Sequence, residues 1–339
     1  MGDNVVTPEV SVLVSMYNAE TSIERALRSV IDQSYTDWEL VVVDDASTDD
    51  SLQVAAATVS GLPQNKARIV HLDTNSGVSA ARNAALSNAR GRWLTFLDAD
   101  DEFTPNRLTE MMDAVDARTD IVICRHTLVQ VDGSRRERGP SVLGRASGRT
   151  SMVTLLNDRL TPYLWDKLFR HSIVRGTRFP EGIHRAEDGL FCLAAMSQAR
   201  EVVSLKTVGY HYYVSAGSLT WGRVSSISES RSLMDHMAKA LSGFRDDREV
   251  QRGLTVSHVL TFLNTANQAI QVLSGDQRNA FVREAQAQIT WRQILVTMRG
   301  RPDFGVAAAV LKVSPRFYGA AYRRYVERLY SLKAEASAS

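Results

Sequence analysis

The chain has 339 residues, enough for one large domain and a smaller additional unit. Its apolar fraction of 44% is ordinary for a globular protein, and a formal net charge of +2 gives no reason to expect a nucleic-acid partner. The two cysteines, Cys124 and Cys192, exclude a cysteine-rich metal site and are expected as small buried side chains in a reducing compartment.

No segment approaches the roughly 18 consecutive apolar residues of a membrane-spanning helix. The N-terminus lacks the basic cluster and apolar run of a secretion signal. We therefore expect a cytoplasmic protein, and the sequence leaves peripheral contact with the inner membrane face open.

Strand-like and helix-like segments alternate through the first hundred residues. Short apolar runs predict strands at 10–14, 39–43, 68–72 and 93–97, and apolar residues at helical spacing predict helices at 21–33, 51–59 and 78–89. The run 40–43 is apolar throughout, as expected for a strand that is buried on both faces. This alternation predicts an α/β fold with a Rossmann-like, mostly parallel sheet that is flanked by helices.

The pattern continues after residue 101 and changes character near residue 224. Before that point we expect helices at 105–117, 151–158 and 187–199, strands at 120–124 and 202–214, and a surface loop or hairpin tip at 132–149. Beyond it, long helical patterns cover 226–244, 250–273, 276–287, 289–298 and 315–334. The sequence therefore predicts a sheet domain at 1–222 and a mainly helical C-terminal region at 223–339.

The last predicted helix combines arginines with tyrosines, among them Arg316, Arg323, Arg324, Tyr318 and Tyr325. One interpretation is an amphipathic helix that packs on its neighbours. The alternative is a basic surface for a membrane face, an anionic polymer or a second subunit, the last giving a homo-oligomer through the C-terminal helices.

Polar and acidic residues follow three of the predicted strands, at 15–18, 44–49 and 98–101. In an open parallel sheet, ligands bind beyond the carboxyl ends of the strands, so we expect these residues to share one site. Asp98 and Asp100 can converge on one Mn²⁺ or Mg²⁺ ion, because such cations prefer oxygen ligands and neutralise a diphosphate leaving group.

Several ordered motifs resemble the family 2 glycosyltransferases with the GT-A fold. They lie at 11–18, 25–39, 41–49, 75–83 and 91–101, and the resemblance extends over roughly residues 9–220. One departure is Ala46, where the family commonly has glycine. The resemblance implies an inverting enzyme that moves a sugar from a UDP-sugar donor to an acceptor hydroxyl. The expected acceptor is a bacterial surface glycan, a teichoic-acid-like polymer or another glycoconjugate. For the helical region, which the resemblance does not cover, acceptor binding, oligomerisation and contact with the membrane face stay open.

The resemblance also implies a donor site. Tyr17 is expected to stack near the uracil, and Asp45 to accept a hydrogen bond from its N3–H. Asp98 is expected near the ribose and the metal, and Asp100 on the metal itself. The implied donor-binding residues are Ser15, Tyr17, Asn18, Asp45, Arg82 and Asp98. For Arg82, an ion pair with one of the aspartates is the alternative to a contact with the donor phosphates.

The expected catalytic base is Asp188. Glu187 and Asp188 open an apolar helix and resemble the family's Glu-Asp motif, whose aspartate deprotonates the acceptor while Glu187 contacts acceptor or phosphate. The alternative is that both carboxylates only cap the helix and favour its dipole.

Further candidates lie outside these motifs. Trp165 and Lys167 belong to a segment that resembles the family's Trp-Asn-Lys, with Asp166 in place of asparagine. Trp165 is expected either under the acceptor sugar or in the core, and Lys167 on a phosphate. His211 is either a third metal ligand, a contact to the diphosphate or a packed strand histidine. The Gly/Ser-rich segment 215–220 is a candidate lid over the donor.

Two other classes of protein stay open. A nucleotidyltransferase shares the metal and the strand-end acids, but it normally has a Gly-rich basic loop after the first strand, which residues 15–20 lack. A degenerate sugar-nucleotide-binding or scaffold module would lack metal or base carboxylates, whereas Asp98, Asp100 and Asp188 are all present. A dehydrogenase is excluded because no Gly-x-Gly-x-x-Gly follows the first strand.

Overall fold

The computed structural model describes residues 7–180, 183, 185–214 and 224–336. The chain divides into two compact units, one made of Met1–Met152 and Arg159–Ser215, the other of Val153–Asp158 and Ala216–Ser339. The segment Val153–Asp158 thus belongs to the helical unit, although the sequence-based division at residue 222 assigned it to the sheet domain. The candidate lid at 215–220 lies outside the described residues.

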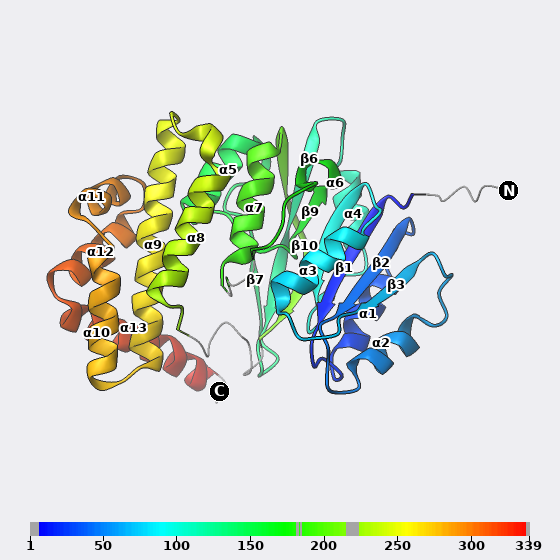
Figure 1. Ribbon diagram of the computed structural model, residues 1–339, viewed down its shortest axis with the longest axis horizontal. Coiled ribbons are helices and arrows are strands. Elements are labelled where there is room, and N and C mark those ends of the chain that lie inside the picture. The colour runs from blue at the N-terminus through cyan, green and yellow to red at the C-terminus, as the bar shows by residue number, and fades with distance from the viewer. Residues whose placement is uncertain (1–6, 181–182, 184, 215–223, 337–339) are drawn as a thin grey trace. The chain divides into compact units, whose positions relative to one another are not determined.

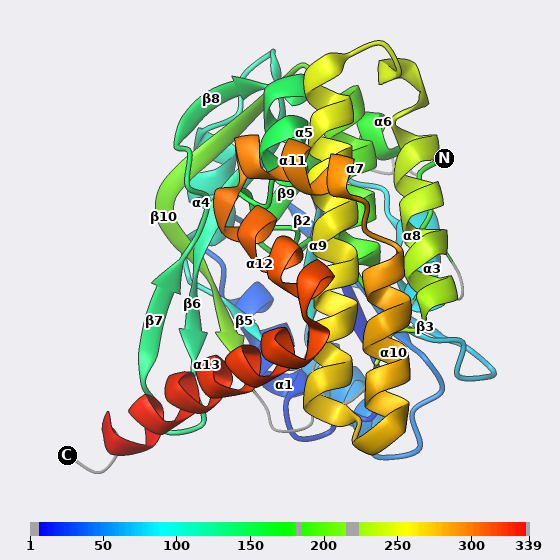
Figure 2. The ribbon, with the colours of Figure 1, turned by 90° about the vertical axis from the view of Figure 1, so that its left-hand side faces the viewer.

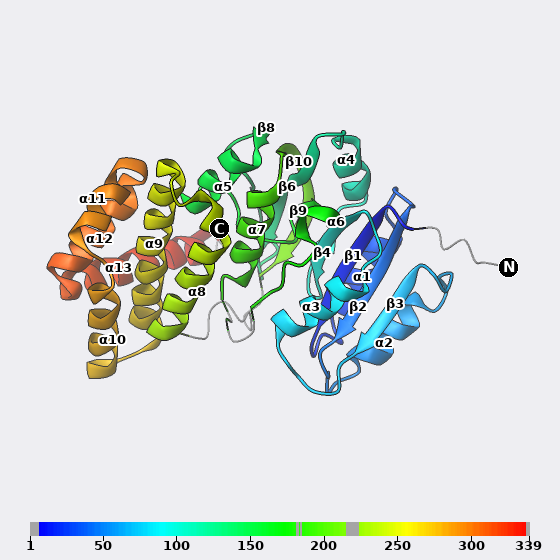
Figure 3. The same cartoon turned by 45° about the horizontal axis from the view of Figure 1, so that its top comes forward.

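The first unit is built on a mixed sheet that begins with four parallel strands (Figure 1). Their spatial order is β3-β2-β1-β4, with β1 Val10–Met16, β2 Trp38–Asp44, β3 Ala67–His71 and β4 Trp93–Asp98. Helices α1 (Ile23–Ile31), α2 (Ser51–Val59) and α3 (Val78–Asn88) connect them. Figure 3 shows β1, β2 and β3 side by side. The parallel strands and intervening helices predicted for the first hundred residues are therefore confirmed.

The far half of the sheet contains antiparallel strands. β9 (Lys167–Arg170) runs antiparallel between β4 and β6 (Thr119–Val129), and β10 (Glu201–Tyr213) runs parallel to β6. The short strands are β5 Glu102–Phe103, β7 Arg135–Arg138 and β8 Gly144–Ser147, and the helices are α4 Arg107–Asp113, α5 Gly148–Leu156, α6 His171–Val174 and α7 Glu187–Gln198. The segment 132–149, expected as a loop or hairpin tip, thus contains two edge strands, β7 on β6 and β8 on β10.

Helices cover both faces of the parallel strands. Val10, Val12 and Val14 of β1 share one apolar cluster with Leu27 of α1 and Ala55 of α2. Side chains alternate between the two faces of a strand, so the intervening positions point the other way, where α3 packs on β1 and β2. The uninterrupted apolar run in β2 is buried because both of its faces are covered.

The second unit is helical and has its own core (Figure 2). Its elements are α8 Ile227–Ala240, a 3₁₀ turn at Ser242–Phe244, α9 Arg248–Val272, α10 Gly275–Ala287, α11 Trp291–Gly300, α12 Pro302–Val313 and α13 Pro315–Ala336. Phe262, Ala266 and Ile270 of α9 pack against apolar residues of the later helices, including Ile294 and Leu311. Helix α12 was not predicted, and its Pro302 occupies the first turn, where proline is tolerated.

Within the described ranges, no helix combines the length and the hydropathy that a membrane span requires. Cys124 and Cys192 are buried free thiols, as the sequence predicted.

Candidate active site

The carboxyl ends of three parallel strands meet at one edge of the sheet. Ser15 of β1 lies in register with Val43 of β2 on one side and with Asp98 of β4 on the other. The loops after these strands therefore start side by side, as the sequence predicted for a shared ligand edge.

Asp45 anchors the loop that leads into α3. Its Oδ1 accepts a hydrogen bond from the amide of Ser76 and its Oδ2 from the amide of Gly77, both at 2.8 Å. Gly77 has a φ of +86°, a conformation that suits glycine, and it directly precedes α3. These two bonds fix the orientation of the Asp45 carboxylate, which is buried at the end of β2.

The loop after β1 is tied to the loop after β2. The side-chain oxygen of Asn18 accepts a hydrogen bond from the backbone N–H of Thr48 at 2.9 Å. The backbone N–H of Asn18 donates to Ser47 Oγ at 3.0 Å. Asn18, an expected donor-binding residue, thus joins the two loops through its side-chain oxygen and its backbone N–H. Tyr17 next to it is half-exposed, and Ala46 adopts a left-handed φ of 58°, the conformation for which glycine is commoner.

Hydrogen bonds from β10 hold the acidic loop that follows β4. The hydroxyl of Tyr210 donates to Asp101 Oδ2 at 2.7 Å, and the amide of Tyr213 donates to Asp101 Oδ1 at the same distance. Burial, together with the charges of Asp98 and Asp100, raises the pKa of Asp101 well above its usual value. The sequence placed Asp101 at the shared ligand edge but predicted no role for it, because that role depends on a strand over a hundred residues away in the sequence.

Arg82 is the centre of the site. Its Nη1 lies 2.6 Å from Asp188 Oδ1 and 3.1 Å from Glu187 Oε1, and its Nη2 lies 3.2 Å from Asp98 Oδ1. The arginine is almost fully buried. Burial lowers the pKa of Arg82, but Asp188, Asp98 and Glu187 together raise it above its usual value, so the guanidinium stays charged. Of the two roles considered for Arg82, the structure shows the ion pair with aspartates.

Glu187 and Asp188 do not cap α7. The N-cap residue is Ala186, with a left-handed φ of 63° and no side-chain cap, and the two acids occupy the first helical turn. Burial raises the pKa of Asp188 to about 7, helped by the charges of Glu187 and Asp98 and opposed by Arg82. A carboxylate with such a pKa can accept a proton near neutral pH.

His211 pairs with an acidic neighbour. Its Nδ1 lies 2.8 Å from Glu102 Oε1, across the antiparallel pairing of β10 and β5. Within the described ranges, Nε2 has no hydrogen-bond partner. Glu102 thus orients the ring, but the described residues do not group His211 with two further ligands that could hold a metal ion.

Trp165 corrects one expectation. The indole is buried and stacks on Tyr163 at 4.6 Å and on Tyr210 at 4.3 Å between ring centroids. Because only 3% of Trp165 is exposed, the indole offers no open face to a sugar, and Trp165 has the core role that was its alternative.

Lys167 corrects another expectation. It is fully buried, and its Nζ bonds Asp166 Oδ1 at 2.7 Å and the carbonyl oxygens of Thr161 and Tyr163 at 2.8 and 2.6 Å. Its ammonium group is therefore occupied by a structural ion pair and cannot reach a phosphate. Asp166, where the family commonly has asparagine, supplies the charge that this buried lysine requires.

The metal ligands expected from the sequence are only partly assembled. No three His, Cys, Asp or Glu side chains of the described residues are grouped closely enough to hold an ion. Burial raises the pKa of Asp100 and the charge of Asp98 raises it further, so a cation beside the two carboxylates would relieve their repulsion. Mg²⁺ and Mn²⁺ commonly take one or two carboxylates and complete their shell with water and substrate phosphates. The residues present fit that mode of binding.

A mostly parallel sheet with Asp45, Asp98 and Asp100 at its strand ends, followed by a helical unit, defines a GT-A type fold. Residues 11–175 match the sequence model of the family described as "Glycosyl transferase family 2". This segment of the chain belongs to that family.

Curated relatives agree with this assignment. The chain is 30% identical over 230 residues to the putative glycosyltransferase EpsH of Bacillus subtilis, an alignment that covers 66% of each chain. It is 31% identical to the succinoglycan biosynthesis protein ExoO of Rhizobium meliloti over 63% of each chain. The matched region therefore spans just under two thirds of these relatives.

Solved structures share the fold. Residues 1–349 of Staphylococcus aureus TarS, in complex with UDP-GlcNAc, match with a TM-score of 0.71 at 22% identity, covering 96% of this chain and 92% of that one. The mannosyltransferase PcManGT of Pyrobaculum calidifontis, in complex with GDP-Man and Mn²⁺, matches with a TM-score of 0.53 at 20% identity. The TarS likeness extends through the helical unit, for which the sequence had suggested no relative.

Proposed function

We propose that the chain is an inverting glycosyltransferase that moves a hexosyl or N-acetylhexosaminyl group from a UDP-sugar to an acceptor hydroxyl. The observation that carries the proposal is the position of Arg82, whose guanidinium joins Asp98 of the strand-end loop to Asp188 of α7. The Arg82 guanidinium thus holds Asp98, which is expected near the donor, close to Asp188, the candidate base. The TarS complex with UDP-GlcNAc, on the same fold, supports a UDP-sugar as the donor.

Asp45 and Tyr17 are the proposed nucleobase contacts. Each oxygen of Asp45 accepts one backbone amide, and a carboxylate oxygen can accept a second bond, so Asp45 can still receive the N3–H of uracil. The exposed ring of Tyr17 can stack on the base, and Ser15 lies beside it at the end of β1.

Asp98 and Asp100 are the proposed holders of a Mn²⁺ or Mg²⁺ ion, whose coordination shell water and the donor phosphates would complete. When bound, the ion would supply positive charge to the diphosphate that leaves. Arg82 lies 3.2 Å from Asp98 and orients that carboxylate.

Asp188 is the proposed general base. It would take the proton of the acceptor hydroxyl while the oxygen attacks the anomeric carbon from the side opposite the diphosphate, which inverts the configuration. The pKa of about 7 makes Asp188 a better proton acceptor than an exposed aspartate would be. The bond to Arg82 fixes its orientation.

A bacterial surface polysaccharide is the proposed class of acceptor, with a teichoic-acid-like polymer or another glycoconjugate as further members. ExoO is named for succinoglycan biosynthesis, and TarS is a poly(ribitol-phosphate) beta-N-acetylglucosaminyltransferase. A cytoplasmic enzyme that works at the inner membrane face would meet such substrates, and association through the C-terminal helices stays part of this proposal.

The test is release of UDP from a panel of UDP-sugars with Mn²⁺ and glycan acceptors, for the wild type and Asp188→Asn. We expect the variant to lose roughly 10²–10⁴-fold in rate while it still binds UDP, because only the base is removed. The product anomer, read by NMR, should be inverted relative to the donor. A wild-type rate in Asp188→Asn, or a retained anomer, would refute the mechanism.

A further inference from the structure

Large apolar side chains gather on the surface of the last three helices. Helices α11, α12 and α13 follow one another on the side of the helical unit that faces the viewer in Figure 2. Their exposed large apolar residues are Trp291, Leu295, Val306, Val313, Phe317 and Tyr325. Single exposed apolar residues are common, but six on three consecutive helices indicate a contact surface.

The same helices are strongly basic. Residues 291–336 include seven arginines and two lysines but three acidic residues, Asp303, Glu327 and Glu335. Asp303 is already paired, since its Oδ2 lies 2.8 Å from Nη2 of Arg301. Exposed apolar residues among uncompensated cations are typical of protein segments that lie on anionic bilayers.

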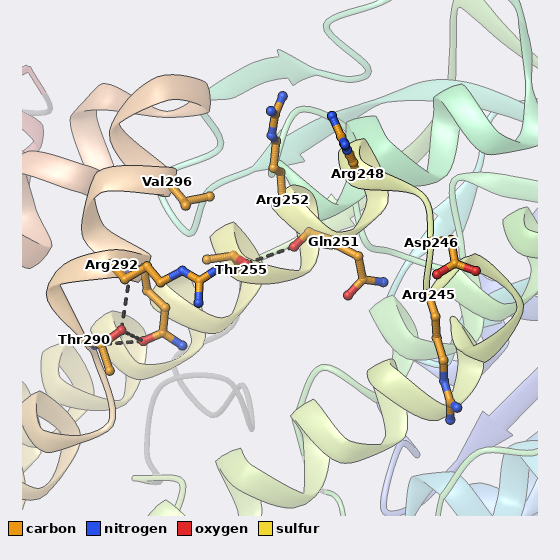
Figure 4. A pocket seen from close by; sticks show the side chains of 10 residues that line it. Arg245, Asp246, Arg248, Gln251, Arg252, Thr255, Thr290, Arg292 and Val296 are labelled. Atoms are coloured by element: carbon orange, nitrogen blue, oxygen red, sulfur yellow. Dashed lines mark hydrogen bonds between the residues drawn. The ribbon is translucent and has the colours of Figure 1, made fainter.

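An arginine pocket adjoins the first of these helices. Figure 4 shows it where the start of α9 faces the start of α11, and its volume is about 540 Å³. Arg245, Arg248 and Arg252 line it near and along α9, and Arg292 lines it from α11. The carboxylate of Asp246 also lines it, so four positive charges face one negative charge. In the part of the chain that the structure describes, none of these four guanidinium groups forms an ion pair. Such a pocket attracts an anion.

The positive charge of the arginine pocket comes from its side chains, because the N-terminal backbone amides of α9 and α11 are already capped. Asp247 caps α9 by accepting hydrogen bonds from the amides of Glu249 and Val250. Thr290 and Gln293 form a capping box at the start of α11. The arginines therefore remain as the groups of the pocket that can bind phosphate.

Helix α11 joins the arginine pocket to the apolar surface. Trp291 and Leu295 are one turn apart and are 52% and 60% exposed. On a helix with 3.6 residues per turn, the side chains of Trp291, Arg292 and Leu295 point within an arc of about 100°. A phosphate bound by Arg292 would thus lie beside the exposed indole.

We propose that this surface binds an anionic phospholipid bilayer, with lipid phosphates in the arginine pocket and Trp291 and Leu295 in the headgroup layer. A hydrated anionic polymer would satisfy the arginines but would gain nothing from the exposed Trp and Leu side chains. The binding uses no residue of the proposed transfer site, so it can fail while the transferase proposal stands.

The test is co-sedimentation of the full chain with phosphatidylcholine vesicles that contain or lack phosphatidylglycerol. We expect binding to the anionic vesicles only, weakening as salt increases and falling about fivefold for each arginine replaced in Arg248→Gln and Arg252→Gln. Trp291→Ser combined with Leu295→Ser should also abolish most of the binding. Arg283→Gln, at an exposed site on α10, is the matched control and should bind as the wild type does.

Three results would overturn the proposal. One is equal sedimentation with neutral and anionic vesicles. Another is arginine-dependent binding to soluble polyphosphate with no vesicle binding, which would indicate an anionic polymer. The third is vesicle-independent self-association that Trp291→Ser and Leu295→Ser remove, which would indicate a second copy of the chain. Circular dichroism and urea unfolding, measured on every variant, report whether the helical unit that carries the substitutions still folds.

Discussion

At the scale of single residues, one buried arginine organises the site. Arg82 lies in contact with Asp98, Glu187 and Asp188, three carboxylates from two distant parts of the sequence. Without the arginine, these carboxylates would repel one another in a poorly hydrated environment.

We predict that Arg82→Gln lowers the free energy of unfolding by about 3 kcal/mol, because it leaves buried acids without their cation. Arg82→Lys should be intermediate, since lysine keeps the charge but not the planar fork that bonds several carboxylates. Urea unfolding at neutral pH measures both, with exposed Arg283→Gln as the control. Unchanged stability in Arg82→Gln would show that the cluster does not hold the fold together.

A pH dependence follows from Asp188. Its pKa is raised from 3.8 to about 7, so the base form, and with it kcat/KM, should grow as pH rises through about 7. The folded state binds this proton more tightly than the unfolded chain, so the contribution of Asp188 to stability should decline as pH rises between these two values. Rate profiles and urea titrations from pH 5 to 9 test both. A flat rate profile in that range would exclude Asp188 as the base.

At the scale of elements, the entry to β4 depends on a close backbone approach. A Cβ on Gly91 would lie 2.5 Å from the backbone nitrogen of Ser11. The Gly91 amide also donates to Ser11 Oγ, which in turn donates to Glu39 at 2.6 Å. The glycine therefore lets β4 start directly against β1.

We predict that Gly91→Ala destabilises the sheet unit by about 2 kcal/mol, because two backbones must move apart to admit the methyl group. Gly61→Ala is the matched control, since a Cβ there meets nothing within 4 Å. Thermal unfolding monitored by circular dichroism compares the two. An equal midpoint for both variants would contradict this account of the strand start.

The parallel strands and long helices could be predicted from apolar periodicity, and the strand-end acids from their position after those strands. Strand β9 could not be predicted, because a run of four residues is too short to show a periodicity. Its antiparallel position between β4 and β6 is set by tertiary packing. Trp165 and Lys167 follow the family pattern in sequence, yet their partners Tyr210 and Thr161 become visible only in the fold. The same holds for the bond between Arg82 and Asp188, which are 106 positions apart.

At the scale of the whole molecule, the chain combines two separate cores. One lies in the sheet unit around β1 and α1, and the other lies around α9. The residues proposed for donor binding and proton transfer all belong to the sheet unit, and the proposed bilayer surface belongs to the helical unit. Chemistry and attachment can therefore be tested by substitutions that do not overlap.

The most direct test of the central claim is the binding of UDP by calorimetry, with and without Mn²⁺, on the wild type and Asp100→Ala, with GDP and TDP as controls. A UDP-sugar-dependent transferase should bind UDP most tightly, should need the metal for that affinity, and should lose the metal dependence in Asp100→Ala. If the folded wild type binds no nucleoside diphosphate with any divalent metal, the chain is not a nucleotide-sugar-dependent transferase.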